Sequence, residues 1–171
     1  GMSLPPPNVR LYVVDAANVA VTHGKNQAFS SRGVELALNF FTAQGHRAIS
    51  FLPSHYLRED RCQATAENPK KVPDDVSLLK TLAEAGVLIL TPPQDYDDMY
   101  MIDYAQRHDG IVVTNDQFRD HTEKVGRESM KFGDFVASMH AQKAADWKEG
   151  HVLSYAFIGD EFMPNPNFRL M

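Results

Sequence analysis

Two stretches of the sequence place an acidic residue at the end of a run of apolar residues. Residues 11–14 lead into Asp15, with Asn18 three positions further on, and residues 110–113 lead through Thr114 to Asp116. Apolar runs without alternation are typical of parallel strands that are covered on both faces, and ligands collect outside the carboxyl ends of such strands. We therefore expect Asp15 and Asp116 to line one acidic cleft.

Two further sites bring acids to the same cleft. Asp97 and Asp98 open a predicted helix, and Asp120 lies four residues after Asp116, on the same face if that segment is helical. Two like charges about 4 Å apart, at an effective dielectric of about 20, repel by roughly 4 kcal/mol. Mg²⁺ or Mn²⁺ prefers carboxylate oxygens and would offset this repulsion. The pattern predicts a metal site formed by Asp15, Asp98 and Asp116, with Asp97 or Asp120 as further ligands.

Each of these residues also has a purely structural interpretation. Asp97 and Asp98 could cap a helix and interact with the positive end of its dipole. Asp120 could be a solvated helix acid, and Asn18 could be a turn residue. Asp15 is harder to explain in this way, because a carboxylate that closes an apolar strand needs a partner. The combination of the four segments favours the metal site.

The elements around these residues alternate between strands and helices. Strands are expected at about 10–15, 47–52, 87–91 and 111–114, and helices from Ser30 or Ser31 to Gln44, from Asp74 or Asp75 to Gly86, and from about 95 to 108. This order is typical of right-handed βαβ units and predicts a three-layer α/β/α sandwich with a mostly parallel central sheet. A long loop with one helical turn is expected at 54–73, a helix at about 129–142 and a last strand at 152–158. Trp147 should pack where these last two meet.

Length and composition set broad limits on the class of protein. We expect a flexible arm at 1–9 and one domain at 10–171. The net charge of -5 argues against a generally basic nucleic-acid coat, although a local basic face is compatible with it. The single cysteine excludes an intramolecular disulfide, no Cys/His spacing resembles a zinc site, and no signal peptide or long apolar run is evident. A soluble, cytoplasmic protein is expected, and a nuclear location stays open.

Five separated motifs strongly resemble the Regnase (MCPIP-type) ribonuclease domain, in the NYN branch of the PIN-like nucleases. They run in order from about Val13 to Pro164. The motifs are Val14-Asp15-Ala-Ala-Asn18-Val-Ala with His23-Gly24, Phe29-Ser-Ser-Arg32-Gly33, Tyr96-Asp97-Asp98, Asp109-Gly110-Ile-Val-Val-Thr-Asn115-Asp116-Gln-Phe-Arg119-Asp120, and Tyr155-Ala-Phe-Ile-Gly-Asp160-Glu-Phe162-Met163-Pro164.

The resemblance implies a PIN-like fold and Mg²⁺-dependent endonucleolytic cleavage of RNA, often of messenger RNA in stem-loops. It places the family's catalytic positions at Asp15, Asn18, Asp97, Asp98, Asp116 and Asp120, and places Arg32 near the cleft. The family's basic loop before the Tyr-Asp-Asp motif is reduced here to residues 92–95, which carry no positive charge. We therefore expect weak RNA binding by the domain alone, with specificity supplied by a homodimer, a flanking region or a protein partner.

The expected mechanism is hydrolysis of RNA phosphodiesters by metal-activated water at the acidic cluster. Asn18 would hold a ligand carboxylate or a metal-bound water. The candidate phosphate contacts are Lys25, Arg32, Arg119 and the helix start at Ser31. Two alternatives stay open: a non-cleaving RNA-binding or scaffold module with a degenerate PIN-like site, and a phosphohydrolase that acts on small phosphoesters through a nucleophilic Asp.

Overall fold

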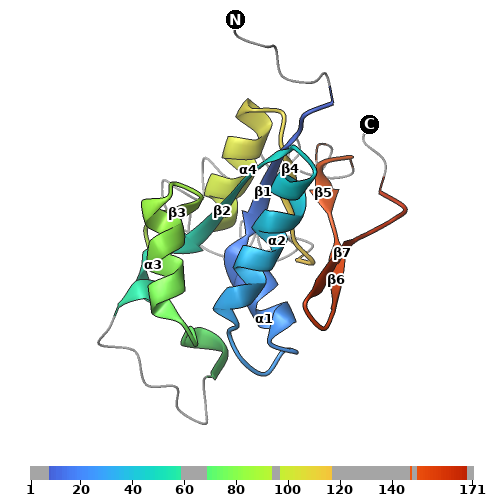
Figure 1. Cartoon of the computed structure of the whole chain (residues 1–171). Coiled ribbons are helices and arrows are strands. Elements are labelled where there is room, and N and C mark those ends of the chain that lie inside the picture. Colours follow the sequence, from blue (N-terminus) through green and yellow to red (C-terminus); the bar gives the residue numbers. More distant parts are fainter. Residues whose placement is uncertain (1–7, 59–68, 94–96, 117–146, 148–149, 169–171) are drawn as a thin grey trace, which may run out of the picture.

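The computed structural model describes residues 8–58, 69–93, 97–116, 147 and 150–168 of the chain. Its centre is a five-stranded parallel sheet in the order β3-β2-β1-β4-β5 (Figure 1). The strands are β1 (Leu11–Asp15), β2 (Arg47–Pro53), β3 (Leu88–Thr91), β4 (Ile111–Val113) and β5 (Val152–Leu153). The strand predictions at 10–15, 47–52, 87–91 and 111–114 are confirmed to within two residues.

Strand β1 is buried on both faces at the middle of the sheet. Val13 and Val14 point to opposite faces and are both fully buried, as the continuous apolar run predicts. Val14 is paired with Ser50 on one side and with Val113 on the other. Strands β1 and β4 are therefore neighbours, and their carboxyl ends lie at the same edge.

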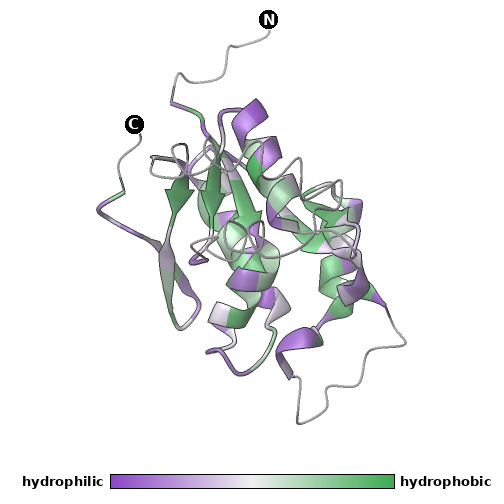
Figure 2. Ribbon diagram, turned by 180° about the vertical axis from the view of Figure 1, so that it is seen from behind, coloured by the Kyte–Doolittle hydropathy of each residue, from purple (hydrophilic) through white to green (hydrophobic). Residues whose placement is uncertain are grey.

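Helices cover both faces of the sheet, which confirms the three layers. Helices α1 (Ala16–His23), α2 (Ser31–Ala43) and α3 (Val76–Glu84) pack on one face, where residues such as Leu38, Phe41 and Leu79 join the core. Helix α4 (Asp97–Arg107) packs on the other face through Met101 and Ala105. Figure 2 shows hydrophobic strands at the centre and hydrophilic residues toward the outside. In the described part of the chain, no helix is long and apolar enough to cross a membrane.

Two adjacent acids cap two different helices. Asp75 is the N-cap of α3, and its Oδ1 accepts a hydrogen bond from the Leu78 N–H at 3.0 Å. Asp74 instead caps α2, because its Oδ1 accepts from the Ser31 N–H at 2.8 Å. The Ser30 side chain, predicted as a cap, makes no capping hydrogen bond. An acid from the segment before α3 thus fixes the start of α2.

Helix α1 was not predicted from the sequence. It follows β1 without a linker, with Asp15 as its N-cap. Its buried residues Ala16, Val19 and Ala20 have helical spacing, but they are few and small. Its last turn contains the polar residues Thr22 and His23.

The predicted last strand at 152–158 is two strands. Its first part is β5 in the main sheet, and its second part, β6 (Tyr155–Ile158), forms an antiparallel hairpin with β7 (Glu161–Pro164). The break has a physical cause, because the Tyr155 N–H donates to the side chain of Asn115, at 3.0 Å, instead of to a neighbouring strand. Figure 1 shows this hairpin beside α1 and α2.

The expected loop at 54–73 contains two short 3₁₀ helices in its described parts, η1 (Ser54–Leu57) and η3 (Pro69–Lys71). Trp147 packs against the core on the α4 face, and its ring stacks on His151 with a centroid distance of 4.7 Å. The arm at 1–7 and the predicted helix at 129–142 lie outside the described residues.

Helices α1 and α2 approach closely at Gly33. A Cβ added there would lie 2.6 Å from the His23 Cβ and 3.1 Å from the Val19 carbonyl oxygen. Neither atom can move without its backbone, so we expect Gly33→Ala to lower the free energy of unfolding by about 1–3 kcal/mol. Chemical denaturation measures this, with Asn39→Ala at an exposed position of the same helix as the control. Helix propensity alone would make Gly33→Ala more stable by about 1 kcal/mol, so a gain in stability would contradict the close packing.

Candidate active site

Asp15 is buried at the carboxyl end of β1, with only 5% of its surface exposed. Its Oδ1 accepts a hydrogen bond from the Asn18 N–H at 3.3 Å, and its Oδ2 accepts from the Thr114 hydroxyl at 3.0 Å. Its position as N-cap places the carboxylate at the positive end of α1. A buried carboxylate needs such partners, because leaving one unpaired costs several kcal/mol.

Thr114 connects Asp15 to Asp116. Its hydroxyl is almost fully buried and, while donating to Asp15, accepts a hydrogen bond from the Asp116 N–H at 3.0 Å. The side chain of Asp116 is exposed. A single hydroxyl thus ties the backbone of Asp116 to Asp15, across the adjacent ends of β1 and β4. The predicted approach of these two segments is present in the structure.

The amide of Asn18 is held by two donors. Its Oδ1 accepts from the Asn115 N–H at 3.0 Å and from the Tyr155 hydroxyl at 2.7 Å. The side chain of Asn115 in turn accepts from the Tyr155 N–H. Thr114, Asn115 and Tyr155 therefore belong to the site, although sequence reasoning assigned no role to them. The polar Thr-Asn-Asp sequence directly after β4 was the feature of the sequence that could have pointed to Thr114 and Asn115.

Tyr155 is a buried and rigidly packed hydrogen-bond donor. Its ring is 6% exposed and stacks on Phe162 with a centroid distance of 5.2 Å. Burial raises the pKa of the Tyr155 hydroxyl far above its usual value; the neighbouring Thr22 hydroxyl lowers it, and the negative charge of Asp15 raises it further. The hydroxyl therefore stays protonated at every pH at which the protein would work.

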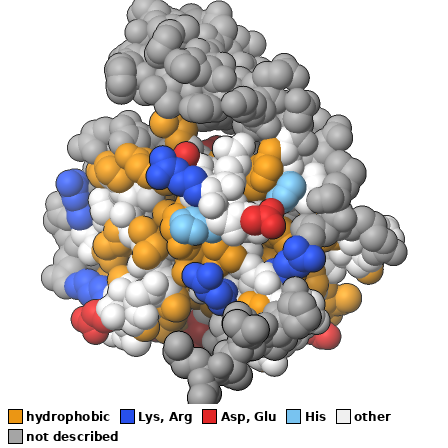
Figure 3. Space-filling model, turned by 90° about the horizontal axis from the view of Figure 1, so that it is seen from above, with side chains coloured by type: hydrophobic (Ala, Val, Ile, Leu, Met, Phe, Trp, Pro, Cys, Tyr) orange, Lys and Arg blue, Asp and Glu red, His pale blue; other side chains and the backbone are white. Residues whose placement is uncertain are grey.

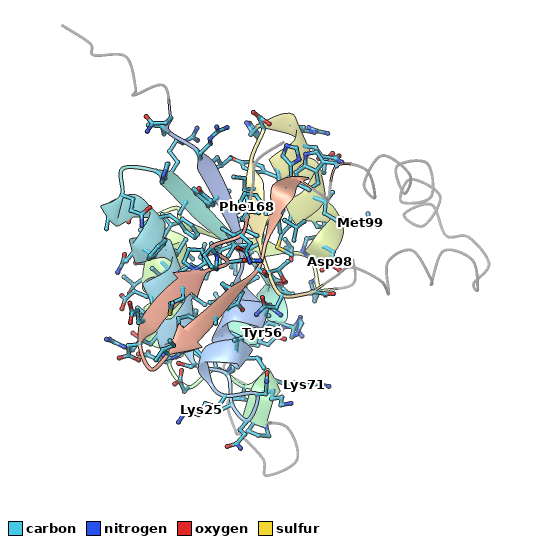
Figure 4. The ribbon with its side chains drawn as sticks, turned by 90° about the vertical axis from the view of Figure 1, so that its right-hand side faces the viewer. Lys25, Tyr56, Lys71, Asp98, Met99 and Phe168 are labelled. Atoms are coloured by element: carbon cyan, nitrogen blue, oxygen red, sulfur yellow. The ribbon has the colours of Figure 1, made fainter. Side chains whose placement is uncertain are left out.

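The second acidic segment begins helix α4. Asp98 is half-buried in its first turn, and Figure 4 shows it at the start of that helix. Asp97 is the first residue of α4, but its side chain lies outside what the structure describes, as do all of Asp120 and Arg119. Among the described residues, no three acidic, His or Cys side chains are grouped as a metal-ligand set.

Comparisons with known proteins show the family and the fold of the chain. Residues 8–170 match the sequence model of the "Zc3h12a-like Ribonuclease NYN domain". The chain belongs to this family. Endoribonuclease rege-1 from Caenorhabditis elegans is 30% identical, over 94% of this chain and 23% of its own length. The resemblance seen in the sequence is confirmed, and the chain spans about a quarter of that relative.

Two solved structures share the fold of this NYN domain. Both are of nuclear protein-only RNase P 2 (PRORP2) from Arabidopsis thaliana, with 22% sequence identity and TM-scores of 0.62 and 0.60. Each comparison covers 94% of this chain and 30% of PRORP2. At this identity the likeness supports the α/β fold alone.

The predicted phosphate contacts of this NYN domain have different surroundings. Lys25 is exposed in the turn between α1 and α2, and Figure 4 shows it with Tyr56 and Lys71 below Asp98. Ser31 is fully buried and its hydroxyl accepts from the Asp75 N–H at 3.3 Å, so its side chain offers no surface to a phosphate. Figure 3 shows the opposite end of the molecule, where Lys and Arg side chains are spread among hydrophobic and His side chains.

Arg32 is exposed but paired with an acid of the β6–β7 turn. Its Nε lies 3.3 Å from Oδ2 of Asp160, and the Nε2 of His23 lies 2.8 Å from the other oxygen. The Nδ1 of His23 lies 2.6 Å from the Ser30 hydroxyl. The hydrogen bond from His23, and to a smaller extent Arg32, lowers the pKa of Asp160. Asp160 therefore stays charged and competes with a phosphate for Arg32.

We expect Arg32→Ala to weaken binding of single-stranded RNA and to lower its salt slope by about 0.7, because one phosphate contact is lost. Binding isotherms at several salt concentrations measure this slope. The matched control is Arg107→Ala, since Arg107 is also exposed and paired with an Asp, at 3.0 Å, but lies at the far end of α4. Equal slopes for the two variants would leave Arg32 as a surface ion pair with no part in RNA binding.

Proposed function

We propose that this NYN domain is an endoribonuclease that hydrolyses RNA phosphodiesters with the help of Mg²⁺ or Mn²⁺. The observation that carries the proposal is the buried Asp15 at the carboxyl end of β1, tied through Thr114 to the segment of Asp116. The carboxyl ends of parallel strands are where ligands bind in α/β folds, and the chain belongs to a ribonuclease family. A carboxylate at this edge of the sheet can therefore take part in the cleavage of RNA. A purely structural role for Asp15 would not require another acid on the segment that Thr114 ties to it.

The donor set suits a hard divalent cation. Asp15, Asp98 and Asp116 supply only carboxylate oxygens, which Mg²⁺ and Mn²⁺ prefer over nitrogen and sulfur. Because the described side chains alone form no three-residue group, these residues would hold the ion together with Asp97 and Asp120 as further candidates. When bound, such an ion lowers the pKa of water and stabilises charge on the phosphoryl oxygens.

The chain's own residues prepare the site for a phosphodiester. Thr114 and the first turn of α1 hold the Asp15 carboxylate in one orientation before any substrate arrives. That preorganisation matters because donors and charges fixed in advance need no rearrangement during the reaction. Lys25 and Arg32 are candidates to hold the backbone of the RNA, which carries charge but little sequence information.

RNA recognition is proposed to depend on more than this domain. The chain has a net charge of -5 and spans 23% of rege-1. Non-specific affinity for RNA comes mainly from phosphates neutralised by Lys and Arg. A flanking region, a second copy or a protein partner would then supply contacts that raise the affinity and select the target.

Incubation of the purified domain with a structured RNA and Mg²⁺ tests this proposal. We expect internal cleavage, seen as pairs of fragments from an RNA labelled at either end. Nitrophenyl phosphate serves as the comparison substrate and should not be hydrolysed. Turnover of nitrophenyl phosphate without RNA cleavage would favour a small-molecule phosphohydrolase. RNA binding without fragments, in Mg²⁺ and in Mn²⁺, would favour the non-cleaving module.

A further inference from the structure

We propose that Tyr155 is a positioning residue, which fixes the Asn18 amide so that its nitrogen, and not its oxygen, is available to the active site. The proposal rests on the nuclease function proposed above. The Tyr155 hydroxyl and the Asn115 N–H both donate to Asn18 Oδ1, at 2.7 and 3.0 Å. Asn18 itself adjoins the acid site, because its N–H donates to Asp15.

The two donors identify which atom of the Asn18 side-chain amide is the oxygen and which is the nitrogen. A backbone N–H can only donate, so the Asn18 atom facing Asn115 must be the oxygen. Thr22 Oγ1 lies 3.0 Å from the Tyr155 hydroxyl, but the Thr22 hydroxyl donates its proton to the backbone carbonyl oxygen of Asn18, at 2.8 Å. Thr22 therefore cannot donate to Tyr155, and the shorter contact of the Tyr155 proton is with Asn18 Oδ1. The orientation of the amide follows from the hydrogen bonds alone.

This orientation changes the role expected for Asn18. An amide oxygen that already accepts two hydrogen bonds is a poor further ligand for a cation, whereas the NH₂ group remains a donor of two hydrogen bonds. Donors suit the oxygens of a phosphate or of a ligand carboxylate. The expectation of a ligand carboxylate as the partner of Asn18 is compatible with this geometry, and it requires the nitrogen end.

Tyr155 can hold Asn18 in a fixed position because its hydroxyl and its backbone N–H both donate hydrogen bonds within the site. Its N–H holds the side chain of Asn115 at 3.0 Å while its hydroxyl holds Asn18. Its ring stacks on Phe162 of the paired strand and meets Phe157 edge-on at 5.8 Å. The β6–β7 hairpin thus holds both Asn18 and the loop after β4 that carries Asp116.

The first test is Tyr155→Phe, which removes one oxygen and keeps the ring. Outer partners of metal sites are typically worth about 10- to 100-fold in activity, so we expect kcat to fall by about that factor while KM changes by less than about twofold. The matched control is Tyr104→Phe, because Tyr104 packs between Phe51 and His108 on the α4 face. Equal kcat for Tyr155→Phe and the unmodified domain would overturn the proposal.

A double-mutant cycle separates positioning from general packing. If Tyr155 acts through Asn18, adding Tyr155→Phe to Asn18→Ala should not lower kcat further. A further loss in the Asn18→Ala background, as large as in the unmodified domain, would show a merely structural role and overturn the proposal.

An NMR measurement needs no activity and keeps the two proposals apart. We expect the Asn18 side-chain NH₂ signals and the exchange rate of the Asn115 amide proton to change in Tyr155→Phe and to stay unchanged in Tyr104→Phe. If Tyr155→Phe does not fold, slow exchange of the Tyr155 hydroxyl proton in the unmodified domain is the expected result, and fast exchange would overturn the proposal. Absence of RNA cleavage with these NMR results would refute the nuclease function alone.

Discussion

Asp15→Asn is expected to lower the rate of RNA cleavage about 1,000-fold. A metal-assisted site supplies several kcal/mol of transition-state stabilisation, and each 1.4 kcal/mol corresponds to a factor of ten. The substitution removes the charge of a carboxylate that is 5% exposed and lies at the centre of the proposed ligand set. Single-turnover cleavage of a labelled RNA measures the loss directly, because it is independent of product release.

The fold should survive this substitution. The amide has the shape of the carboxylate, and its oxygen can still accept from the Asn18 N–H. The amide nitrogen would face the Thr114 hydroxyl, which can turn and accept a hydrogen bond from it. The free energy of unfolding would therefore fall by at most about 1 kcal/mol, the net contribution of one hydrogen bond. Relief of charge repulsion acts in the opposite direction. We expect the same circular dichroism spectrum and a melting temperature within a few degrees of the unmodified domain.

A matched acid outside the site serves as the control. Asp103 is exposed on α4 and paired with Arg107, one helical turn away at 3.0 Å. Asp103→Asn removes one charge of the same kind and should leave cleavage unchanged. Retention of more than about a tenth of the activity in Asp15→Asn would exclude Asp15 from the proposed chemistry.

The central sheet could be predicted because its signal is local. Burial on both faces makes β4 and the part of β1 before Asp15 a continuous hydrophobic run, so a short window of sequence contains the information. The carboxyl ends of neighbouring parallel strands must then share an edge, which places Asp15 and Asp116 together without any knowledge of side-chain positions. Helix α1 gave no such signal, because it is short, begins directly at Asp15 and buries only Ala16, Val19 and Ala20.

The hydrogen-bond partners of the site could not be predicted, because they join distant segments. Tyr155 lies 137 residues after Asn18, and Asp160 lies 128 residues after Arg32. These contacts depend on how the β6–β7 hairpin docks beside α1, and a short window of sequence does not contain that docking. The same docking explains why the apolar run at 152–158 is divided, since Tyr155 leaves the sheet to bond Asn115.

The acids also show how one residue type serves two purposes. Asp74 and Asp75 are solvent-exposed and cap helices, which fully accounts for them. Asp15 caps α1 as well, but it is buried and bonded to a second strand through Thr114. Capping alone does not require burial, so the additional cost of placing this carboxylate inside the protein indicates a further use.

Removal of divalent metal should abolish cleavage, and Mg²⁺ should stabilise the folded domain. The described acids do not by themselves form a three-residue ligand set. Binding would therefore draw Asp15, Asp98 and Asp116 together with groups outside the described residues, and it would occur only in the folded chain. At a free Mg²⁺ concentration of about 100 Kd the gain is about 2.7 kcal/mol. For a chain of this size that corresponds to a rise in melting temperature of about 5–10 °C.

Thermal melts in EDTA and across a Mg²⁺ series, with NaCl holding the ionic strength constant, measure this rise. The melting temperature of Asp103→Asn should keep its full dependence on Mg²⁺, and that of Asp15→Asn should lose it. This comparison separates specific binding from screening of surface charge, which would affect both variants alike. An equal rise in the two variants would mean that Mg²⁺ binds elsewhere and that Asp15 is not one of its ligands.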